Sequence, residues 1–254
     1  MNLIQENQSL KEFPALKESF VKISVFNNQL TSLPEELWNQ IHCKELNLSC
    51  NKIEIIDERI SQLTHLEMLD LGHNQIQSIP STIGNLKNLF RYLYLHDNKM
   101  THLPESISSL NLLRYLNVSE NRLTDLPEHI GQMKSLIELN VSKNQLRNLP
   151  VSFDNLLSLK VLDLSFNELS AIPSGNIGLR ELSFRGNKLN KIPSEITNFT
   201  QLRKLDLRGN QISEIPSYLL ELQKLERLDL RWNPLTTNPD WVKNLEERGC
   251  IVYT

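Results

Sequence analysis

Residues 205–216 read LDLRGNQISEIP, and this short stretch decides the fold. Leu205 and Leu207 alternate with polar residues, as in a β-strand that buries one of its faces. Asn210 lies where the chain leaves that strand, and two isoleucines follow it after the turn. One such unit cannot enclose a core around four aliphatic side chains, so several units must stack side by side.

The same pattern, L-x-x-L-x-L-x-x-N, returns along the chain, with other apolar residues sometimes in place of leucine. Successive units are 23 residues apart, except for a step of 24 before Asn98 and a step of 20 before Asn187. Six residues beyond the asparagine there is a proline in nine of the ten units, replaced by Asp57 in the second. The ten asparagines are predicted to form a buried ladder that pairs loop backbone groups: Asn28, Asn51, Asn74, Asn98, Asn121, Asn144, Asn167, Asn187, Asn210 and Asn233.

Over residues 20–239 the chain resembles the intracellular class of leucine-rich repeat proteins, whose units read L-x-x-L-x-L-x-x-N-x-L-x-x-L-P-x-x-I. Plant Ras-group-related proteins, Ras-pathway scaffolds and many bacterial proteins carry such units. The resemblance implies an α/β fold: a right-handed solenoid, curved like a horseshoe, with a concave parallel sheet of about ten strands and short helices or turns on the convex side. It implies no single function, because these repeats serve many partners.

The strand positions follow from the pattern. Each strand is predicted to be parallel to its neighbours in sequence order and to centre on the second leucine of its unit. These leucines are Leu46, Leu69, Leu93, Leu116, Leu139, Leu162, Leu182, Leu205 and Leu228. The extra residue near Leu89–Phe90 and the three missing residues near 174–177 are predicted to fall on the convex side or in its turns, outside the strands.

The chain is predicted to form one continuous domain, with an N-terminal cap at 1–19, ten repeats at 20–238 and a C-terminal cap at 239–254. The first cap contains a degenerate half-repeat, LKEFP, and we expect a short helical turn before Phe20. The second is predicted to begin with a helix from Pro239, capped by Asn238, and to end in a short strand.

Composition excludes several classes of protein. The chain has 254 residues and a net charge of -3, which does not indicate a nucleic-acid-binding or membrane-inserted protein. It begins without the basic and apolar regions of a secretory signal. Three N-x-S sequons would place glycans on the concave strands and block them, at Asn47, Asn117 and Asn140. We therefore expect a cytoplasmic protein, or one exported from a bacterium without a classical signal peptide.

The inward leucines leave the alternate strand positions facing solvent on the concave sheet. In the third to fifth units these positions gather a group that we call the tyrosine patch: Met68, Tyr92, Tyr94, His96 and Tyr115. Protein interfaces concentrate Tyr and Met, because such side chains bury area at low entropic cost. High strand propensity is the alternative reason for tyrosines on a sheet. We favour the partner-binding interpretation and expect exposed side chains here.

A second group follows the last strands: Arg185, Arg208 and Arg231, with Phe166 and Trp232 beside them. Arginines at strand spacing repel one another, so a negative group is expected among them. Two aspartates of the same strands, Asp206 and Asp229, supply it if the cluster neutralises itself. The alternative is a site for an anion or an acidic partner, and the sequence leaves both interpretations open.

Little else indicates chemistry. His73 and His96, with Asp70 and Asp97 nearby, are possible metal ligands, although surface histidines are more often incidental. No nucleophile, zinc-protease or phosphate-loop motif occurs, and we expect no catalytic residue, metal or cofactor. Cys43 takes an inward leucine position and is predicted to belong to the core.

The sequence therefore predicts a non-enzymatic, monomeric scaffold that binds a partner protein on its concave face. One alternative is a bacterial effector or adhesion-type protein that binds host proteins with the same face. An enzyme is the other, and an open concave sheet argues against it because it excludes little water.

Overall fold

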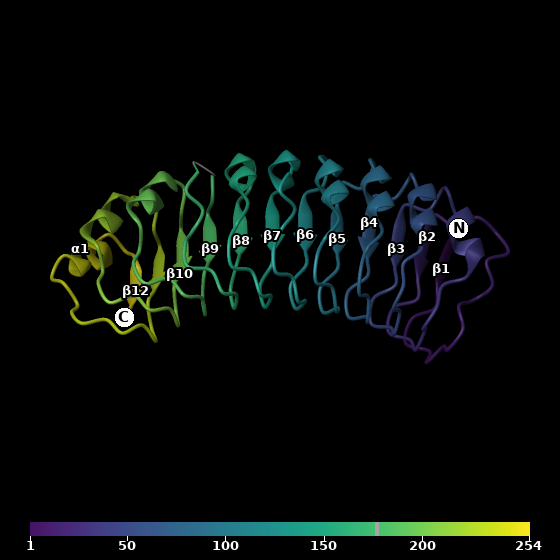
Figure 1. The fold of residues 1–254 in the computed structure, drawn as a ribbon, viewed down its shortest axis with the longest axis horizontal. Coiled ribbons are helices and arrows are strands. Elements are labelled where there is room, and N and C mark those ends of the chain that lie inside the picture. Colours follow the sequence, from purple (N-terminus) through teal and green to yellow (C-terminus); the bar gives the residue numbers. More distant parts are fainter. Residues whose placement is uncertain (176–177) are drawn as a thin grey trace.

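The computed structural model describes residues 1–175 and 178–254. Its strands form one parallel sheet in which every strand pairs with its neighbours in sequence order. Figure 1 shows the coils stacked into an arc, with the helices along the outer side and the chain termini at opposite ends. The predicted solenoid with a parallel sheet is confirmed, and all nine predicted leucines are strand centres.

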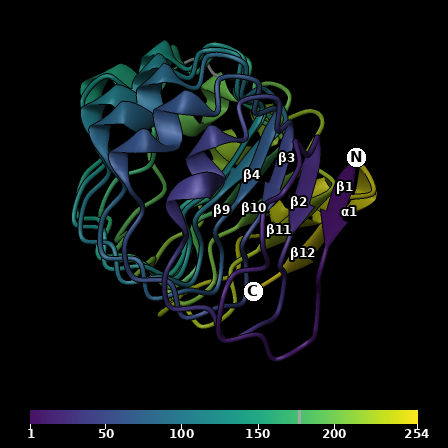
Figure 2. The same ribbon diagram turned by 90° about the vertical axis from the view of Figure 1, so that its right-hand side faces the viewer.

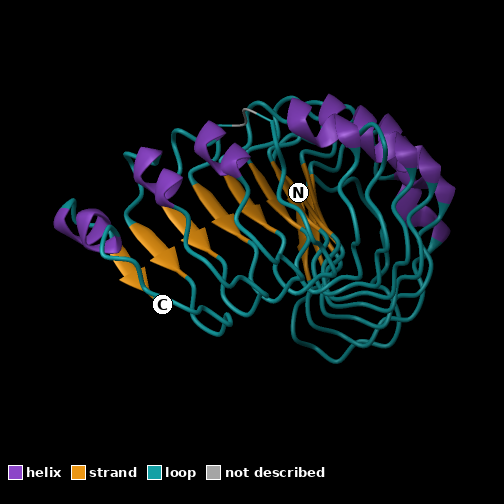
Figure 3. Ribbon diagram, turned by 60° about the vertical axis from the view of Figure 1, so that its left-hand side comes forward, coloured by secondary structure: helices purple, strands orange, loops and turns teal. Residues whose placement is uncertain are grey.

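The described residues contain twelve short strands: β1 Asn2–Ile4, β2 Lys22–Ser24, β3 Glu45–Asn47, β4 Met68–Asp70, β5 Tyr92–Tyr94, β6 Tyr115–Asn117, β7 Glu138–Asn140, β8 Val161–Asp163, β9 Glu181–Ser183, β10 Lys204–Asp206, β11 Arg227–Asp229 and β12 Ile251–Tyr253. The opposite side carries single-turn 3₁₀ helices and one α-helix: η1 Glu35–Asn39, η2 Glu58–Gln62, η3 Ser81–Asn85, η4 Glu105–Ser109, η5 Ile130–Gln132, η6 Val151–Asn155, η7 Ser194–Asn198, η8 Ser217–Glu221 and α1 Val242–Glu247. Figures 2 and 3 show the strands on one side of the coil and the helices on the other.

The core fills the space between these two sides. Leu205 and Leu207 are each 1% exposed, and Ile212, beyond the turn, is fully buried. The same positions are buried in neighbouring repeats, so the aliphatic side chains form one continuous core along the arc. Stacking thus supplies the buried volume that a single unit lacks.

The asparagine ladder is confirmed by its hydrogen bonds. Asn144 represents the pattern: its Oδ1 accepts from the Leu123 N–H at 2.9 Å, and its Nδ2 donates to the carbonyls of Val118 and Val141 at 3.0 Å. Each amide therefore joins its own repeat to the one before it. Nine of the ten asparagines are buried, while Asn233 is partly exposed.

The residue before each of these asparagines has a left-handed backbone, with φ between 49° and 66°. That conformation turns the chain out of the strand, and it favours glycine over bulky side chains. The ten positions are Asn27, Cys50, His73, Asp97, Glu120, Lys143, Phe166, Gly186, Gly209 and Trp232. Phenylalanine and tryptophan are the bulkiest residues in this set.

The recurring proline precedes the 3₁₀ helices of most repeats. Pro80, for example, holds φ at -64° directly before η3. In the second repeat Asp57 takes the place of the proline, and its carboxylate accepts a hydrogen bond from the Arg59 N–H at 2.8 Å. Proline fixes the backbone at these positions, and Asp57 caps the helix instead.

Two expectations about the caps are wrong. Residues 1–19 contain a strand, β1, and no helical turn before Phe20, because the first residues extend the sheet by pairing with β2. The C-terminal helix runs over Val242–Glu247, so Asn238 does not cap it; a turn closed by the Val242 N–H and the Pro239 carbonyl comes first. The expected last strand is confirmed as β12, and a strand in each cap raises the total from about ten to twelve.

The longer step places its extra residue directly before β5, outside the strand as predicted. Pairing between β4 and β5 consequently begins at Leu69 with Leu93, so Met68 and Tyr92 do not pair. The Arg114 N–H donates to the Phe90 carbonyl at 3.1 Å, which shows that the inserted residue is bonded to the next coil. The shorter step lies partly at residues 176–177, outside the described residues, while the strands on either side of it, β8 and β9, keep the regular register.

Candidate functional site

Three tyrosines lie on adjacent strands, as the sequence predicts. Tyr92 and Tyr94 of β5 stack with ring centroids 4.5 Å apart, and Tyr115 of β6 pairs in register with Tyr92. Tyr115 is 37% exposed, whereas Tyr92 and Tyr94 are half-buried. The expectation of exposed side chains is therefore wrong for the tyrosines of β5, because each ring of the pair covers the other.

His96 extends this row beyond the strand and is also only half-exposed. Its ring lies over the Cα of Gly72, where a Cβ would overlap it, and meets the Tyr94 ring edge to face at 5.9 Å. Its Nε2 is 3.2 Å from the Nε2 of His73, so at least one of these nitrogens must lack a proton and accept the bond. The absence of a side chain on Gly72 thus fixes the place of the imidazole.

Met68 does not belong to the exposed surface, contrary to the expectation. It is 5% exposed. Arg91, which follows the inserted residue, forms an ion pair with Glu45 two strands away, and β4 lies between the two partners. A charged bridge therefore spans the strand that carries Met68, and the tyrosine patch is reduced to Tyr92, Tyr94, His96 and Tyr115.

The environment of His96 shifts its proton equilibrium. Burial, followed by the nearby His73 ring, lowers the pKa of His96 below 6.5. Burial also raises the pKa of the Asp70 carboxyl beside it. The imidazole of His96 is consequently neutral at pH 7.

We predict that the His96 ring protons titrate in NMR spectra with a midpoint below 6.5. A depressed folded-state pKa means that the unfolded chain binds the proton more tightly, so stability falls as the pH drops from the unfolded pKa toward the folded one. His96→Gln is expected to flatten this part of the stability profile. A midpoint at or above 6.5 would contradict the burial of the ring.

The histidine pair does not complete a metal site. His73 Nδ1 lies 2.7 Å from Asp97 Oδ2, which orients the ring. In residues 1–175 and 178–254, no three His, Cys, Asp or Glu side chains converge as metal ligands. The thiols are equally unsuited to nucleophilic chemistry: burial raises the pKa of Cys43 to about 12 and also raises that of Cys50. Cys43 is fully buried, as predicted.

Arg185, Arg208 and Arg231, which we call the arginine column, differ in whether an aspartate neutralises them. Arg208 Nε donates to both carboxylate oxygens of Asp206, at 2.9 and 3.0 Å. Arg231 bonds Asp229 through Nε at 2.9 Å and Nη2 at 2.6 Å. Burial, the largest single effect, would raise the pKa of Asp229, but the hydrogen bonds from Arg231 and the charges of Arg231 and Arg208 together lower that pKa. These two arginines are neutralised internally.

Arg185 has different neighbours. Its guanidinium carbon lies 4.9 Å from the ring centroid of Phe166 and 5.0 Å from that of Trp232. Among the described residues it forms no ion pair. The arginine column therefore holds two arginines with internal salt bridges and one, Arg185, whose guanidinium lies over two aromatic rings.

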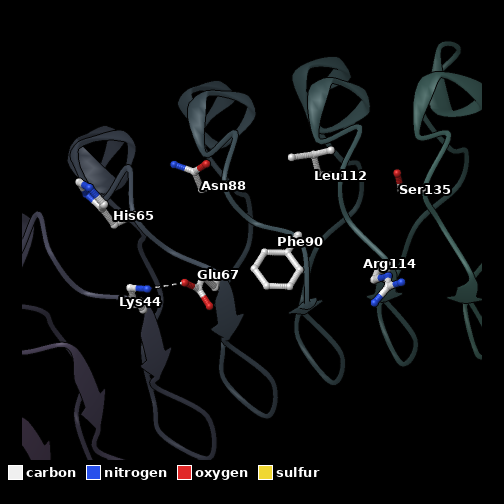
Figure 4. Close-up of a pocket in the computed structure, with 8 residues that line it drawn as sticks. All are labelled: Lys44, His65, Glu67, Asn88, Phe90, Leu112, Arg114 and Ser135. Atoms are coloured by element: carbon white, nitrogen blue, oxygen red, sulfur yellow. Dashed lines mark ion pairs between the residues drawn. The ribbon is translucent and has the colours of Figure 1, made fainter.

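The structure has a groove along the flank of the arc that the sequence did not predict. It lies where the chain passes from the helices to the strands (Figure 4), and its volume is about 550 Å³. Phe90, the inserted residue, projects into its middle and is 39% exposed, and Leu112 beside it is 49% exposed. At one end Lys44 and Glu67 form an ion pair at 2.8 Å. The 24-residue step was the available sequence signal, since it marks where an extra side chain emerges.

Family models agree with the geometry of stacked coils. Models described as leucine rich repeat match residues 20–76 and 41–91, and a model of a leucine-rich repeat region matches 88–174. A two-copy leucine-rich repeat model matches 177–217 and 200–244. This chain is a leucine-rich repeat protein. No curated protein sequence matches it.

Solved structures include similar leucine-rich repeat proteins from bacteria and plants. One from Leptospira interrogans is 27% identical, with 92% of this chain and 78% of that chain covered and a TM-score of 0.58. The plant peptide hormone receptor RGFR1, in complex with RGF2, is 29% identical, with coverage of 84% and 36% and a TM-score of 0.73.

The ectodomain of the Arabidopsis thaliana receptor kinase GASSHO1/SCHENGEN3 is 28% identical, with 89% of this chain and 31% of that chain covered and a TM-score of 0.64. This leucine-rich repeat protein thus spans about a third of either plant chain. Among its described residues, no helix has the length and apolar character needed to cross a membrane.

Proposed function

We propose that this leucine-rich repeat protein is a non-enzymatic scaffold that binds a partner protein on its concave face, through Tyr92, Tyr94, His96 and Tyr115. One observation carries the proposal: the partly exposed Tyr115 ring lies beside a stacked tyrosine pair on an open sheet. Rigid aromatic side chains grouped in this way give large contact area at low entropic cost.

The hydroxyl groups of the patch support the same interpretation. On the opposite side of the coil, the Tyr218 hydroxyl donates a hydrogen bond to the Ile192 carbonyl and so stabilises the fold. No described residue accepts such a bond from the hydroxyls of Tyr92, Tyr94 or Tyr115, and these groups are left available to a partner. A buried tyrosine normally hydrogen-bonds its hydroxyl within the protein. Tyrosine hydroxyls without such a bond on a surface therefore favour recognition of a partner.

The similar proteins favour protein recognition as a class of function. The two plant structures are complexes, with RGF2 and with CASPARIAN STRIP INTEGRITY FACTOR 2. Because a similar protein comes from Leptospira interrogans, a bacterial effector or adhesion-type role is the second candidate function. We propose a monomer that resides in the cytoplasm or is exported from a bacterium, and no nucleic-acid partner.

Tyr115→Ala is expected to weaken the partner complex about 30-fold while leaving the melting temperature nearly unchanged, because the ring is partly exposed. Tyr94→Ala should also cost about 1 kcal/mol of stability, since its stacking on Tyr92 is lost. The immobilised protein would capture partners from an extract of its source organism, and calorimetry on the purified partner would give each Kd.

Glu138→Ala on the next strand, β7, is the matched control and should keep wild-type affinity. If Tyr115→Ala binds the partner like wild type, the patch is not the docking site. If it loses stability while the complex persists, the tyrosines serve the architecture instead.

A further inference from the structure

We propose a second, separate binding site, in which the Arg185 guanidinium between Phe166 and Trp232 receives the carboxylate of an acidic side chain from a partner protein. The site follows strands β8 to β11 at the turn out of the sheet, and it does not depend on the tyrosine patch. The ligand class is a single Asp or Glu with an apolar side chain beside it.

The contacts of Arg185 leave its donors free. The guanidinium carbon of Arg185 lies over two rings, 4.9 Å from the Phe166 centroid and 5.0 Å from the Trp232 centroid, and no described residue forms a hydrogen bond or ion pair with its N–H groups. The N–H groups lie in the plane of the guanidinium, which is the geometry that binds a carboxylate through two parallel hydrogen bonds. Two aromatic contacts also restrict the side chain before any ligand arrives, which reduces the entropic cost of binding.

The backbone makes room for this arrangement. Gly186 and Gly209 occupy the left-handed turn positions between Phe166 and Trp232. A Cβ on Gly186 would lie 2.7 Å from the Phe166 ring, so glycine allows that ring to lie across the neighbouring coil toward Arg185.

The two aromatic residues are costly at their positions. Bulky side chains are disfavoured at a positive φ, yet Phe166 and Trp232 hold φ at 55° and 63°. They are also 44% and 65% exposed, so burial of the rings offsets little of this cost. Strain together with exposure at two flanking positions points to a role in recognition.

The charge balance selects the ligand. Over β8 to β11 and the turns that follow, five cations face four carboxylates: Arg185, Lys204, Arg208, Arg227 and Arg231 against Asp163, Glu181, Asp206 and Asp229. Lys204 pairs with Glu181 at 2.8 Å, and Arg227 lies 3.5 Å from Asp229. The surplus of one positive charge is matched by one carboxylate, whereas a nucleic-acid backbone would bring several negative charges to this surplus of one.

The rings complete the specificity. Trp232 also lies within cation–π distance of Arg208 and Arg231, at 5.7 and 5.8 Å, so its ring covers the turn side of the arginine column. An apolar side chain next to the bound carboxylate would cover the exposed indole and exclude water from the salt bridge. Exclusion of water strengthens a charge-assisted hydrogen bond.

The test is selection of random phage-displayed peptides on the purified full chain, followed by calorimetry of the enriched peptides. We expect enrichment of Asp or Glu next to an apolar residue. Changing that acidic residue to Gln or Asn in the peptide, or Arg185→Gln in the protein, should each weaken binding about tenfold, and the two changes together should weaken it little further.

Arg122→Gln is the control, because Arg122 is an exposed arginine on another turn. Tyr115→Ala should leave these peptides bound, which separates this site from the tyrosine patch. Equal melting temperatures of Arg185→Gln and wild type would show that the loss is not unfolding. Absence of acidic enrichment, wild-type binding by Arg185→Gln, or tighter binding of a phosphopeptide or an oligonucleotide would overturn the proposal.

Discussion

Replacing Asn144 with alanine is expected to lower the free energy of unfolding by about 3 kcal/mol. The substitution removes the acceptor of the Leu123 N–H and the donor to the carbonyls of Val118 and Val141. These backbone groups are buried inside the arc, where water cannot replace the lost amide. A buried group without a partner costs its full desolvation energy, and here two repeats lose bonds together.

Urea denaturation followed by circular dichroism measures this loss, and Asn111→Ala is the matched control. Asn111 is an exposed asparagine two repeats earlier, so its removal should change stability by less than about 0.5 kcal/mol. Hydrogen exchange should show the Leu123 amide losing protection in Asn144→Ala. Equal denaturation midpoints for the two variants would mean that the ladder contributes nothing beyond the backbone.

The fold could be predicted because its determinants repeat at a fixed spacing. A leucine at a strand centre, such as Leu139, has the same environment in every coil, so one local rule predicts all the registers. The caps lack this periodicity. The strand Asn2–Ile4 forms because β2 offers it a free edge, and that pairing partner is not encoded in the local residues.

The members of the concave surface were predicted, but their exposure was not. Counting back from Asn98 places Tyr92 and Tyr94 on the same face, as observed. Tyr92 and Tyr94 stack on each other, and Met68 is buried on the strand that the Arg91–Glu45 ion pair spans. Side-chain conformations of this kind depend on contacts between coils. The residue types at one position of successive repeats therefore do not determine them.

The arginine column shows the same limit. Arg208 and Arg231 each have an aspartate two residues earlier on the same strand, and both pairs form. The equivalent position before Arg185 is Ser183, which cannot neutralise it. That difference was readable from the sequence, whereas the contact with Trp232, two coils away, required the structure.

Gly131→Ala is expected to lower the free energy of unfolding by about 3 kcal/mol, at the upper end of the range for overpacking. A Cβ on Gly131 would overlap the backbone carbonyl of Ser152 in the next coil and lie 3.0 Å from the Cβ of Asn155. The obstacle is backbone rather than the flexible end of a side chain, so η5 and η6 must separate. Separation at one coil weakens the stacking on which each repeat depends.

The equivalent helix position of the preceding repeat holds Ser108, and it should respond in the opposite direction. Ser108 Oγ is buried and has no hydrogen-bond partner among the described residues. Ser108→Ala removes that hydroxyl and is expected to raise stability by up to about 1 kcal/mol. Thermal denaturation of both variants tests the contact between convex helices. If Gly131→Ala is as stable as wild type, the coils can spread at no cost and their close approach does not set the curvature of the arc.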